Sequence, residues 1–135
     1  MKMNQISLSE VREHTFVVTD DDLAAFHGTV VHPVCGTFTL AREIEYASRL
    51  FVLDLKENDE EGIGTELSIT HLGSAFPGEK VSIVATLEKL TEEDVICSYT
   101  AKVGERLVAQ GTTGQKVFQK EKIIRHFSRL SDNDQ

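Results

Sequence analysis

The spacing of apolar residues changes once along this chain, and that change constrains the fold more than any other feature. From Phe38 to Leu55 apolar side chains recur every three or four residues, and neither glycine nor proline interrupts them before Gly62. From Ile63 onward they recur at every second residue, the spacing of strands. The pattern predicts one helix of about five turns followed by a series of strands.

The predicted strands are joined by short turns. Four follow the helix and one precedes it, at residues 63–71, 81–87, 95–103, 107–118 and 14–19. Strands joined in this way are antiparallel neighbours, and their sheet needs a cover on one face. Residues 23–32 are interpreted as a loop or a short helical turn. The fold class is therefore α+β, with the long helix wrapped by a sheet of about five antiparallel strands.

The length of the chain favours one domain. With 135 residues and 40% hydrophobic residues, we expect a single domain over residues 1–135 with its core at about 14–118. Residues 119–135 are expected to form a peripheral helix or tail, with 131–135 disordered. Residues 116–129 carry five Lys or Arg side chains against one Glu. We interpret them as a solvated surface helix, with a phosphate-contacting role as the alternative.

Charge and cysteine content exclude several classes of partner. A net charge of −8 argues against nucleic acid, because phosphate-backbone binding rests on clustered Lys and Arg. The two cysteines, Cys35 and Cys97, form no disulfide framework, which fits a reducing cytoplasm. The sequence shows neither a signal-peptide run at its start nor about 18 consecutive apolar residues, so we expect a cytoplasmic protein without a membrane partner.

A metal site and a cysteine nucleophile are weaker hypotheses. His27, His32 and Cys35 lie close together in the sequence, but a fourth ligand is lacking nearby, and structural zinc normally takes four. We therefore expect the histidines to be solvent-facing or capping residues, and we expect no metal and no cofactor. Cys35 would need a neighbouring histidine to act as a nucleophile, and otherwise reads as a small buried thiol.

Glu45 is the first candidate for chemistry. At about 100° per residue it falls at the margin of the apolar stripe of the predicted helix. A carboxylate in that position is expected to be partly desolvated, which suits a general base or a carboxylate nucleophile. The alternative is an ordinary surface ion pair with Arg49, four residues further on.

His71 and Thr37 are the second and third candidates. His71 is in phase with Ile63 and Leu67 on the face expected to be buried, so it is either a satisfied core histidine or a residue at a cleft. Thr37 precedes the helix, where a threonine is a good N-cap. If residues 37–45 are all helical, Thr37 and Glu45 lie about 12 Å apart along the axis. Either Thr37 lies in a loop that folds back towards Glu45, or a bound substrate bridges the two side chains.

The stretch C-G-T-F-T-L-A-R-E-I-E-Y-A, followed by G-I-G-T-E-L-S-I-T-H-L-G-S-A-F-P-G-E-K-V, resembles the fluoroacetyl-CoA thioesterase-like family of the hotdog fold. In that family the active site holds a threonine before the central helix, a glutamate eight residues later and a histidine in a G-T-x-x-x-x-T-H segment. The matching positions are Thr37, Glu45 and His71. A glycine whose backbone N–H is associated with the thioester carbonyl matches Gly64, and Gly36 is expected to contact substrate.

The resemblance covers about residues 14–118 and implies a homodimer with active sites at the interface. It implies hydrolysis of a short or small acyl-CoA thioester to free acid and CoA. The alternative is a hotdog protein that binds an acyl-CoA-like ligand without cleaving it.

The sequence departs from the family pattern at two places. Family members often carry a histidine and an arginine where this chain has Thr113 and Gln115. The resemblance therefore does not predict contacts between the last strand and CoA. The loop before Thr37 is short, and no counterpart of the family's lid can be placed in it.

Overall fold

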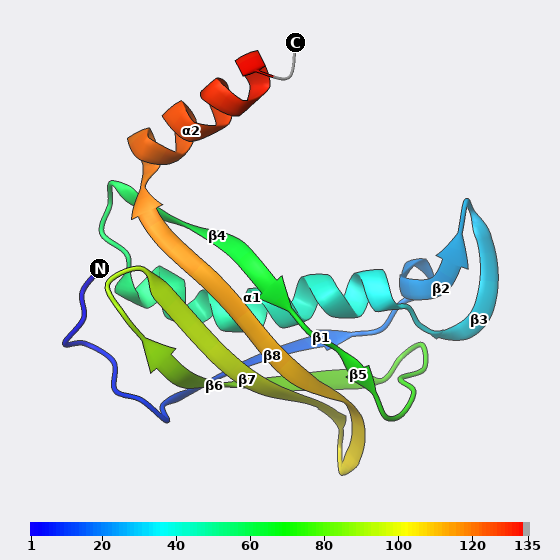
Figure 1. Cartoon of the computed structure of the whole chain (residues 1–135). Helices are drawn as coiled ribbons and strands as arrows, with labels where there is room; N and C mark the ends of the chain where they lie inside the picture. The colour runs from blue at the N-terminus through cyan, green and yellow to red at the C-terminus, as the bar shows by residue number, and fades with distance from the viewer. Residues whose placement is uncertain (134–135) are drawn as a thin grey trace.

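The structure is a computed structural model that describes residues 1–133, and its main feature is one long helix lying across a curled antiparallel sheet (Figure 1). Helix α1 runs from Thr37 to Leu55, which confirms the predicted helix. The sheet contains β1 (Val11–Val17), β4 (Glu60–Leu67), β5 (Thr70–His71), β6 (Lys80–Leu90), β7 (Asp94–Val103) and β8 (Arg106–Gln119). The order is β1-β6-β7-β8-β4, with β5 also paired to β8. The predicted α+β arrangement is confirmed.

The core lies between α1 and the concave face of the sheet. Helix α1 buries a stripe of side chains that includes Leu40, Ile44 and Phe51. These pack against the alternate inward residues of β6 and β7, such as Ile83 and Cys97, all fully buried. The burial of these apolar side chains is the main stabilising term in folding. Their close packing fixes the position of α1 along the sheet.

The predicted strand at residues 63–71 is interrupted once. β4 and β5 both pair with β8 in a continuous register, Leu67 opposite Thr113 and Thr70 opposite Gln110. At the interruption, the hydroxyl of Tyr99 donates a hydrogen bond to the carbonyl of Ser68 over 2.8 Å. This contact fixes the backbone that leads into His71.

The prediction of a loop or helical turn at residues 23–32 is wrong. After a short 3₁₀ helix, η1 (Asp20–Asp22), the chain forms a hairpin of β2 (Leu23–Phe26) and β3 (Thr29–Cys35). His27 and Gly28, at φ of 50° and 81°, make its two-residue turn, and positive φ at both positions is the geometry that matches the twist of paired strands. The hairpin is a separate two-stranded sheet beyond the N-terminal end of α1 (Figure 1).

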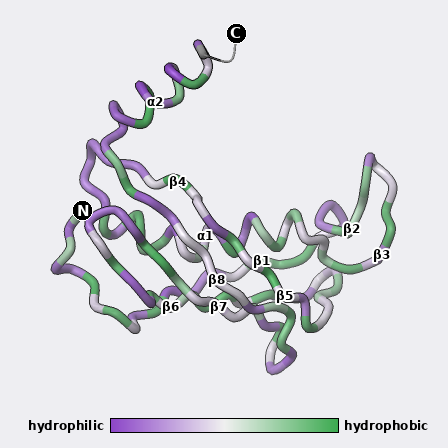
Figure 2. Tube along the Cα trace, in the orientation of Figure 1, coloured by the Kyte–Doolittle hydropathy of each residue, from purple (hydrophilic) through white to green (hydrophobic). Residues whose placement is uncertain are grey.

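The C-terminal segment forms α2 (Lys120–Asn133), a helix that projects from the end of β8. Residues 131–133 are therefore helical, contrary to the expectation of disorder, and residues 134 and 135 lie outside the described part. Figure 2 shows polar and apolar residues interleaved along α2. Its exposed apolar side chains are Ile124, Phe127 and Leu130.

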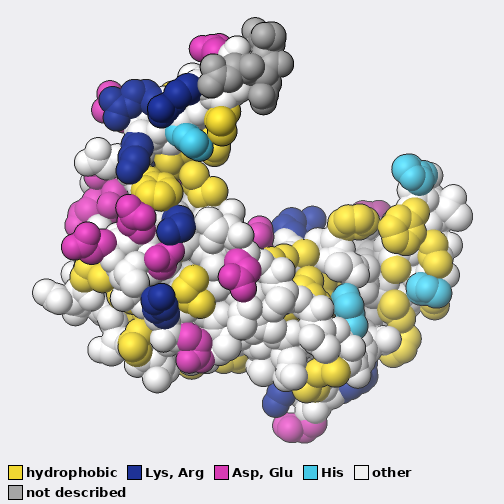
Figure 3. All heavy atoms as spheres, in the orientation of Figure 1, with side chains coloured by type: hydrophobic (Ala, Val, Ile, Leu, Met, Phe, Trp, Pro, Cys, Tyr) yellow, Lys and Arg dark blue, Asp and Glu magenta, His cyan; other side chains and the backbone are white. Residues whose placement is uncertain are grey.

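The hairpin and α2 rise at opposite ends of the molecule and flank a hollow (Figures 1 and 3). Hydrophobic side chains gather on both, and Phe26, Val30 and Val31 are the exposed ones on the hairpin. Within residues 1–133, neither α1 nor α2 is long and apolar enough to cross a membrane.

Candidate active site

The N-terminal end of α1 brings Thr37 and His71 together. Gly36 is the N-cap, and Thr37 is the first helical residue, so the alternative role of Thr37 as the N-cap is not what the structure contains. Its hydroxyl instead lies 3.1 Å from Nε2 of His71, a hydrogen bond between residues 34 positions apart.

His71 pairs with the buried Ala109 of β8 and faces the helix side, but it is exposed rather than buried, because α1 begins there and covers nothing beyond. The predicted phase with Ile63 is wrong, because a bulge in β4 between Gly64 and Glu66 puts Ile63 on the opposite face.

A cleft of about 220 Å³ adjoins this pair. Thr37 and His71 line it together with Gly36, Cys35 and apolar residues of the hairpin, α1 and β8. Burial, reinforced by the charge of Asp22, raises the pKa of the Cys35 thiol to about 11. The thiol is therefore protonated near neutrality, which argues against Cys35 as a nucleophile.

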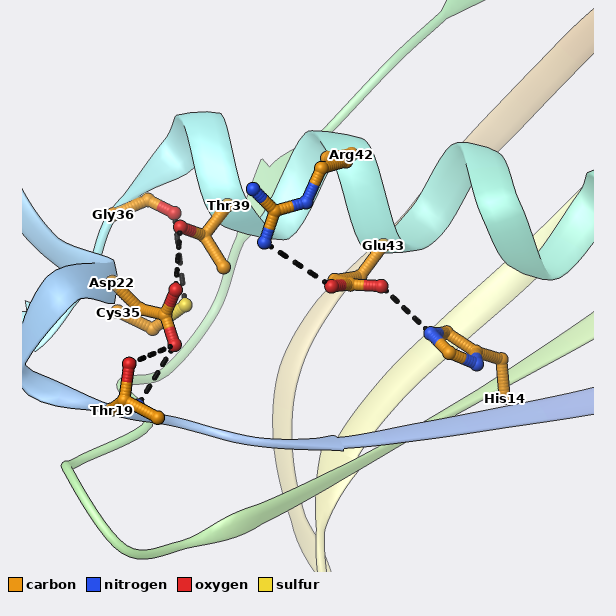
Figure 4. A network of polar contacts seen from close by, with 8 residues as sticks. All are labelled: His14, Thr19, Asp22, Cys35, Gly36, Thr39, Arg42 and Glu43. Carbon is orange, nitrogen blue, oxygen red and sulfur yellow. Dashed lines mark hydrogen bonds and ion pairs between the residues drawn. The ribbon is translucent and has the colours of Figure 1, made fainter.

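Asp22 fixes the start of α1, where Gly36 and Thr39 lie beside it (Figure 4). Its carboxylate accepts hydrogen bonds from the Thr39 hydroxyl at 3.2 Å and from the Thr19 backbone N–H at 2.8 Å. Its carbonyl accepts the Gly36 N–H at 2.8 Å. Gly36 also packs closely, since a Cβ there would lie 3.0 Å from the Ala24 Cα. The Thr19-x-x-Asp22 spacing, a capping box, is a sequence signal that could have identified this junction.

Glu45 lies against Gly64, two turns along α1. A Cβ on Gly64 would stand 3.2 Å from the Glu45 Oε1, so the absence of a side chain at 64 leaves room for the carboxylate. Glu45 is exposed in this chain, which corrects the expectation of partial desolvation. Beside it, β4 carries a bulge: Gly64 pairs with Gln115 and Glu66 with Gly114, which leaves Thr65 without a partner. Bulges are enriched next to active sites.

The alternative of an ion pair between Glu45 and Arg49 is not what the structure contains. Arg49 donates instead to Glu61 of β4, over 2.9 Å. That hydrogen bond, with one from the Gly62 N–H, lowers the pKa of Glu61 to about 2. Within the described residues, the Glu45 carboxylate has neither an ion pair nor a side-chain hydrogen bond, so it is free to act on a ligand.

A groove of about 350 Å³ runs past Glu45 and Gly64, and Gln115 lines it as well. Gln115 is buried and donates to the Ser48 hydroxyl at 3.1 Å, and Ser48 donates to the Glu45 carbonyl at 3.0 Å. This chain of hydrogen bonds ties the turn that carries Glu45 to β8. The position that departs from the family pattern therefore has a structural role here.

The structure brings the candidate residues together in two pairs rather than in one cluster. Thr37 lies in the regular helix, so Glu45 is about 12 Å away along its axis. The cleft lined by Thr37 and His71 and the groove lined by Glu45 and Gly64 have no lining residue in common. Within one chain, the site is in two halves.

A further pair of titratable side chains joins β1 to α1 and was not predicted from the sequence. His14 of β1 and Glu43 approach to 2.7 Å, and Arg42 lies 3.3 Å from the same carboxylate (Figure 4). Each side chain of the His14–Glu43 pair is about one fifth exposed. No local spacing indicates a pair between residues so far apart in the sequence.

The histidines considered for a metal are exposed, both at His27 and at His32. Over residues 1–133, no three His, Cys, Asp or Glu side chains are arranged to hold a metal ion.

Residues 18–121 match the family described as FlK, the fluoroacetyl-CoA-specific thioesterase. The chain belongs to the FlK family. The match includes both halves of the candidate site, which gives the FlK resemblance seen in the sequence an independent basis. Comparison with curated proteins found no match.

Solved structures agree with this assignment. A thioesterase superfamily member from Thermus thermophilus, described as hypothetical, is 32% identical, with 97% of each chain covered and a TM-score of 0.91. The FlK thioesterase itself is 20% identical over 93% of this chain and 98% of its own, with a TM-score of 0.85. A hot-dog-like protein from Thermanaerovibrio acidaminovorans is 14% identical over 96% and 97%, with a TM-score of 0.86. The hotdog fold is confirmed.

Proposed function

We propose that this protein hydrolyses a short or small acyl-CoA thioester to the free acid and CoA. The observation that carries the proposal is the contact between the Thr37 hydroxyl and the His71 imidazole, made by residues that the FlK family match includes. The cleft beside them, about 220 Å³ with partly apolar walls, has a size that suits a short acyl group. FlK structures are described with fluoroacetate and with acetyl-CoA, which supports the same substrate class here.

Each candidate residue has a role in the proposed reaction. Hydrolysis needs an attack on the thioester carbonyl, a donor for the developing oxyanion and release of the thiolate. Glu45 either attacks the carbonyl, forming an anhydride with the acyl group that water then hydrolyses, or takes a proton from the attacking water, and the Gly64 N–H holds the oxyanion. Thr37 and His71 position the attacking group, and His71 can pass a proton to the leaving sulfur. Rapid acid quenching separates the two routes, since only a Glu45 nucleophile leaves an acylated chain of increased mass.

A homodimer joins the two halves of the site. β4 is an edge strand: within the described residues it pairs with β8 on one side, and its other side has no partner strand. Such an edge is a template for pairing with another strand. The hollow between the hairpin and α2 opens beside it, with exposed apolar side chains on both flanks. We propose that a second copy fills this hollow, so that Thr37 and His71 of one chain meet Glu45 and Gly64 of the other.

The proposed activity is tested by thiol release from a panel of acetyl-, butyryl-, octanoyl- and palmitoyl-CoA. We expect release with the shortest chains and a fall in kcat/KM as the acyl chain lengthens. Binding of these thioesters without thiol release would instead support a ligand-binding protein and would overturn the proposed function.

A further inference from the structure

A second cleft lies where α2 meets the corner of the sheet. Its volume is about 240 Å³, and it is lined by Ile63, Phe118, Lys122, Ile123, His126 and Arg129. We propose that this cleft binds the adenosine 3′,5′-bisphosphate end of CoA. The inference rests on the proposed function, because it identifies where that substrate's nucleotide is held.

The lining has two chemically distinct parts. Ile63, Phe118 and Ile123 form an apolar floor, and Lys122, His126 and Arg129 form a polar rim on successive turns of α2. The ammonium of Lys122 stands 4.9 Å from the centre of the Phe118 ring. An aromatic ring next to cationic groups suits a nucleotide, since the base stacks on the ring and the phosphates meet Lys and Arg.

Charge complementarity favours an anionic occupant. Residues 1–119 hold 19 Asp or Glu against 10 Lys or Arg, so most of the surface repels a ligand with several phosphate charges. The four arginines in that part all pair with carboxylates. In α2, by contrast, Lys122 and Arg129 make no ion pair with any described residue. Their charge is available to a ligand.

The cleft is also placed for a substrate that reaches Glu45. Ile63 and Gly64 are neighbours on β4, and adjacent side chains of a strand point to opposite faces. The nucleotide would therefore lie on the outer face, while the thioester carbonyl lies at Gly64 on the helix face. The flexible pantetheine arm would connect the two, passing around the corner of the sheet where α2 begins.

Two positions on β8 are too buried to bind the nucleotide. The two positions in question, Thr113 and Gln115, are 2% and 7% exposed, so neither can reach the phosphates of a CoA molecule at the surface. A basic group on α2 supplies the anion contact that these residues cannot make.

Arg129→Glu tests the proposal against Arg125→Glu, an identical charge reversal on the same helix outside the cleft. KM is measured at low salt for acetyl-CoA and for S-acetyl-N-acetylcysteamine, which has the same thioester and no nucleotide. We expect Arg129→Glu to raise the ratio of the two KM values about fivefold, and Arg125→Glu to leave it within about twofold. Lys122→Glu should behave like Arg129→Glu.

Calorimetry measures the binding of adenosine 3′,5′-bisphosphate to the same cleft without any hydrolysis. The proposed binding site is supported if the full chain binds this nucleotide, Arg129→Glu weakens the binding and Arg125→Glu does not. That result would stand even if neither thioester were cleaved and the proposed function failed. Equal KM ratios in all variants, or nucleotide binding that Arg129→Glu does not weaken, would overturn the inference while leaving thioesterase activity intact.

Discussion

Replacing Glu45 with glutamine should remove most of the activity and leave the fold unchanged. The substitution keeps the shape of the side chain and removes its charge and basicity. Glu45 is exposed, and its carboxylate has no ion pair or side-chain hydrogen bond within residues 1–133, so we expect the free energy of unfolding to change by less than about 0.5 kcal/mol. The Ser48 hydroxyl bonds to the backbone of Glu45 and does not depend on the side chain.

The expected loss in kcat is large. A positioned general base contributes about 10² to 10⁴ in rate, so the activation barrier should rise by about 3 to 5 kcal/mol. The assay is thiol release from acetyl-CoA, with urea unfolding of the same preparation as the stability check. Asp54→Asn is the matched control, because Asp54 lies on α1, pairs with Arg12 at 3.0 Å and does not line the groove. A folded Glu45→Gln variant with kcat/KM within about threefold of wild type would refute the assignment.

Three other substitutions test the surroundings of the two halves. Gly64→Ala places a methyl group 3.2 Å from the Glu45 Oε1 and should lower kcat by about tenfold with little change in KM, measured by steady-state kinetics. Glu61→Gln frees Arg49 to pair with Glu45 and should reduce activity. Because the pKa of Glu61 is lowered to about 2, its stabilising effect is full above pH 4.5 and is lost as pH falls towards 2. Acid titration of unfolding should show that loss, about 1 kcal/mol after screening, in wild type and not in Glu61→Gln. Cys35→Ala should keep kcat within about twofold, and strong inactivation would implicate the thiol.

Local periodicity was sufficient for the main elements of the fold. A spacing of three and four residues predicted α1, and alternation predicted the strands that pair in the main sheet, because those patterns report directly which face is buried. The hairpin at β2 and β3 was missed because β2 has only four residues and β3 is largely exposed, so neither strand shows a clear alternation. Its one signal was Gly28 after Phe26-His27, a two-residue turn before a β-branched run.

The sequence named candidate residues for the site but could not predict their geometry. The pairing of Arg49 was decided by Glu61, a residue of another element, which helix spacing cannot anticipate. The contact of Thr37 with His71 depends on where α1 begins relative to β5, which tertiary packing decides and sequence spacing does not. The resemblance named the candidate positions, and only the structure revealed that one chain holds them in two separate halves.

A mixed dimer tests the central claim most directly. One chain carries Thr37→Ala and His71→Ala, the other carries Glu45→Gln, and differently tagged copies are co-expressed so that the heterodimer can be purified. If each site combines Thr37 and His71 of one chain with Glu45 of the other, the heterodimer has one intact site and should release thiol from acetyl-CoA at about half the wild-type rate, while both parent homodimers are inactive. A heterodimer as inactive as its parents would contradict a site shared between two chains.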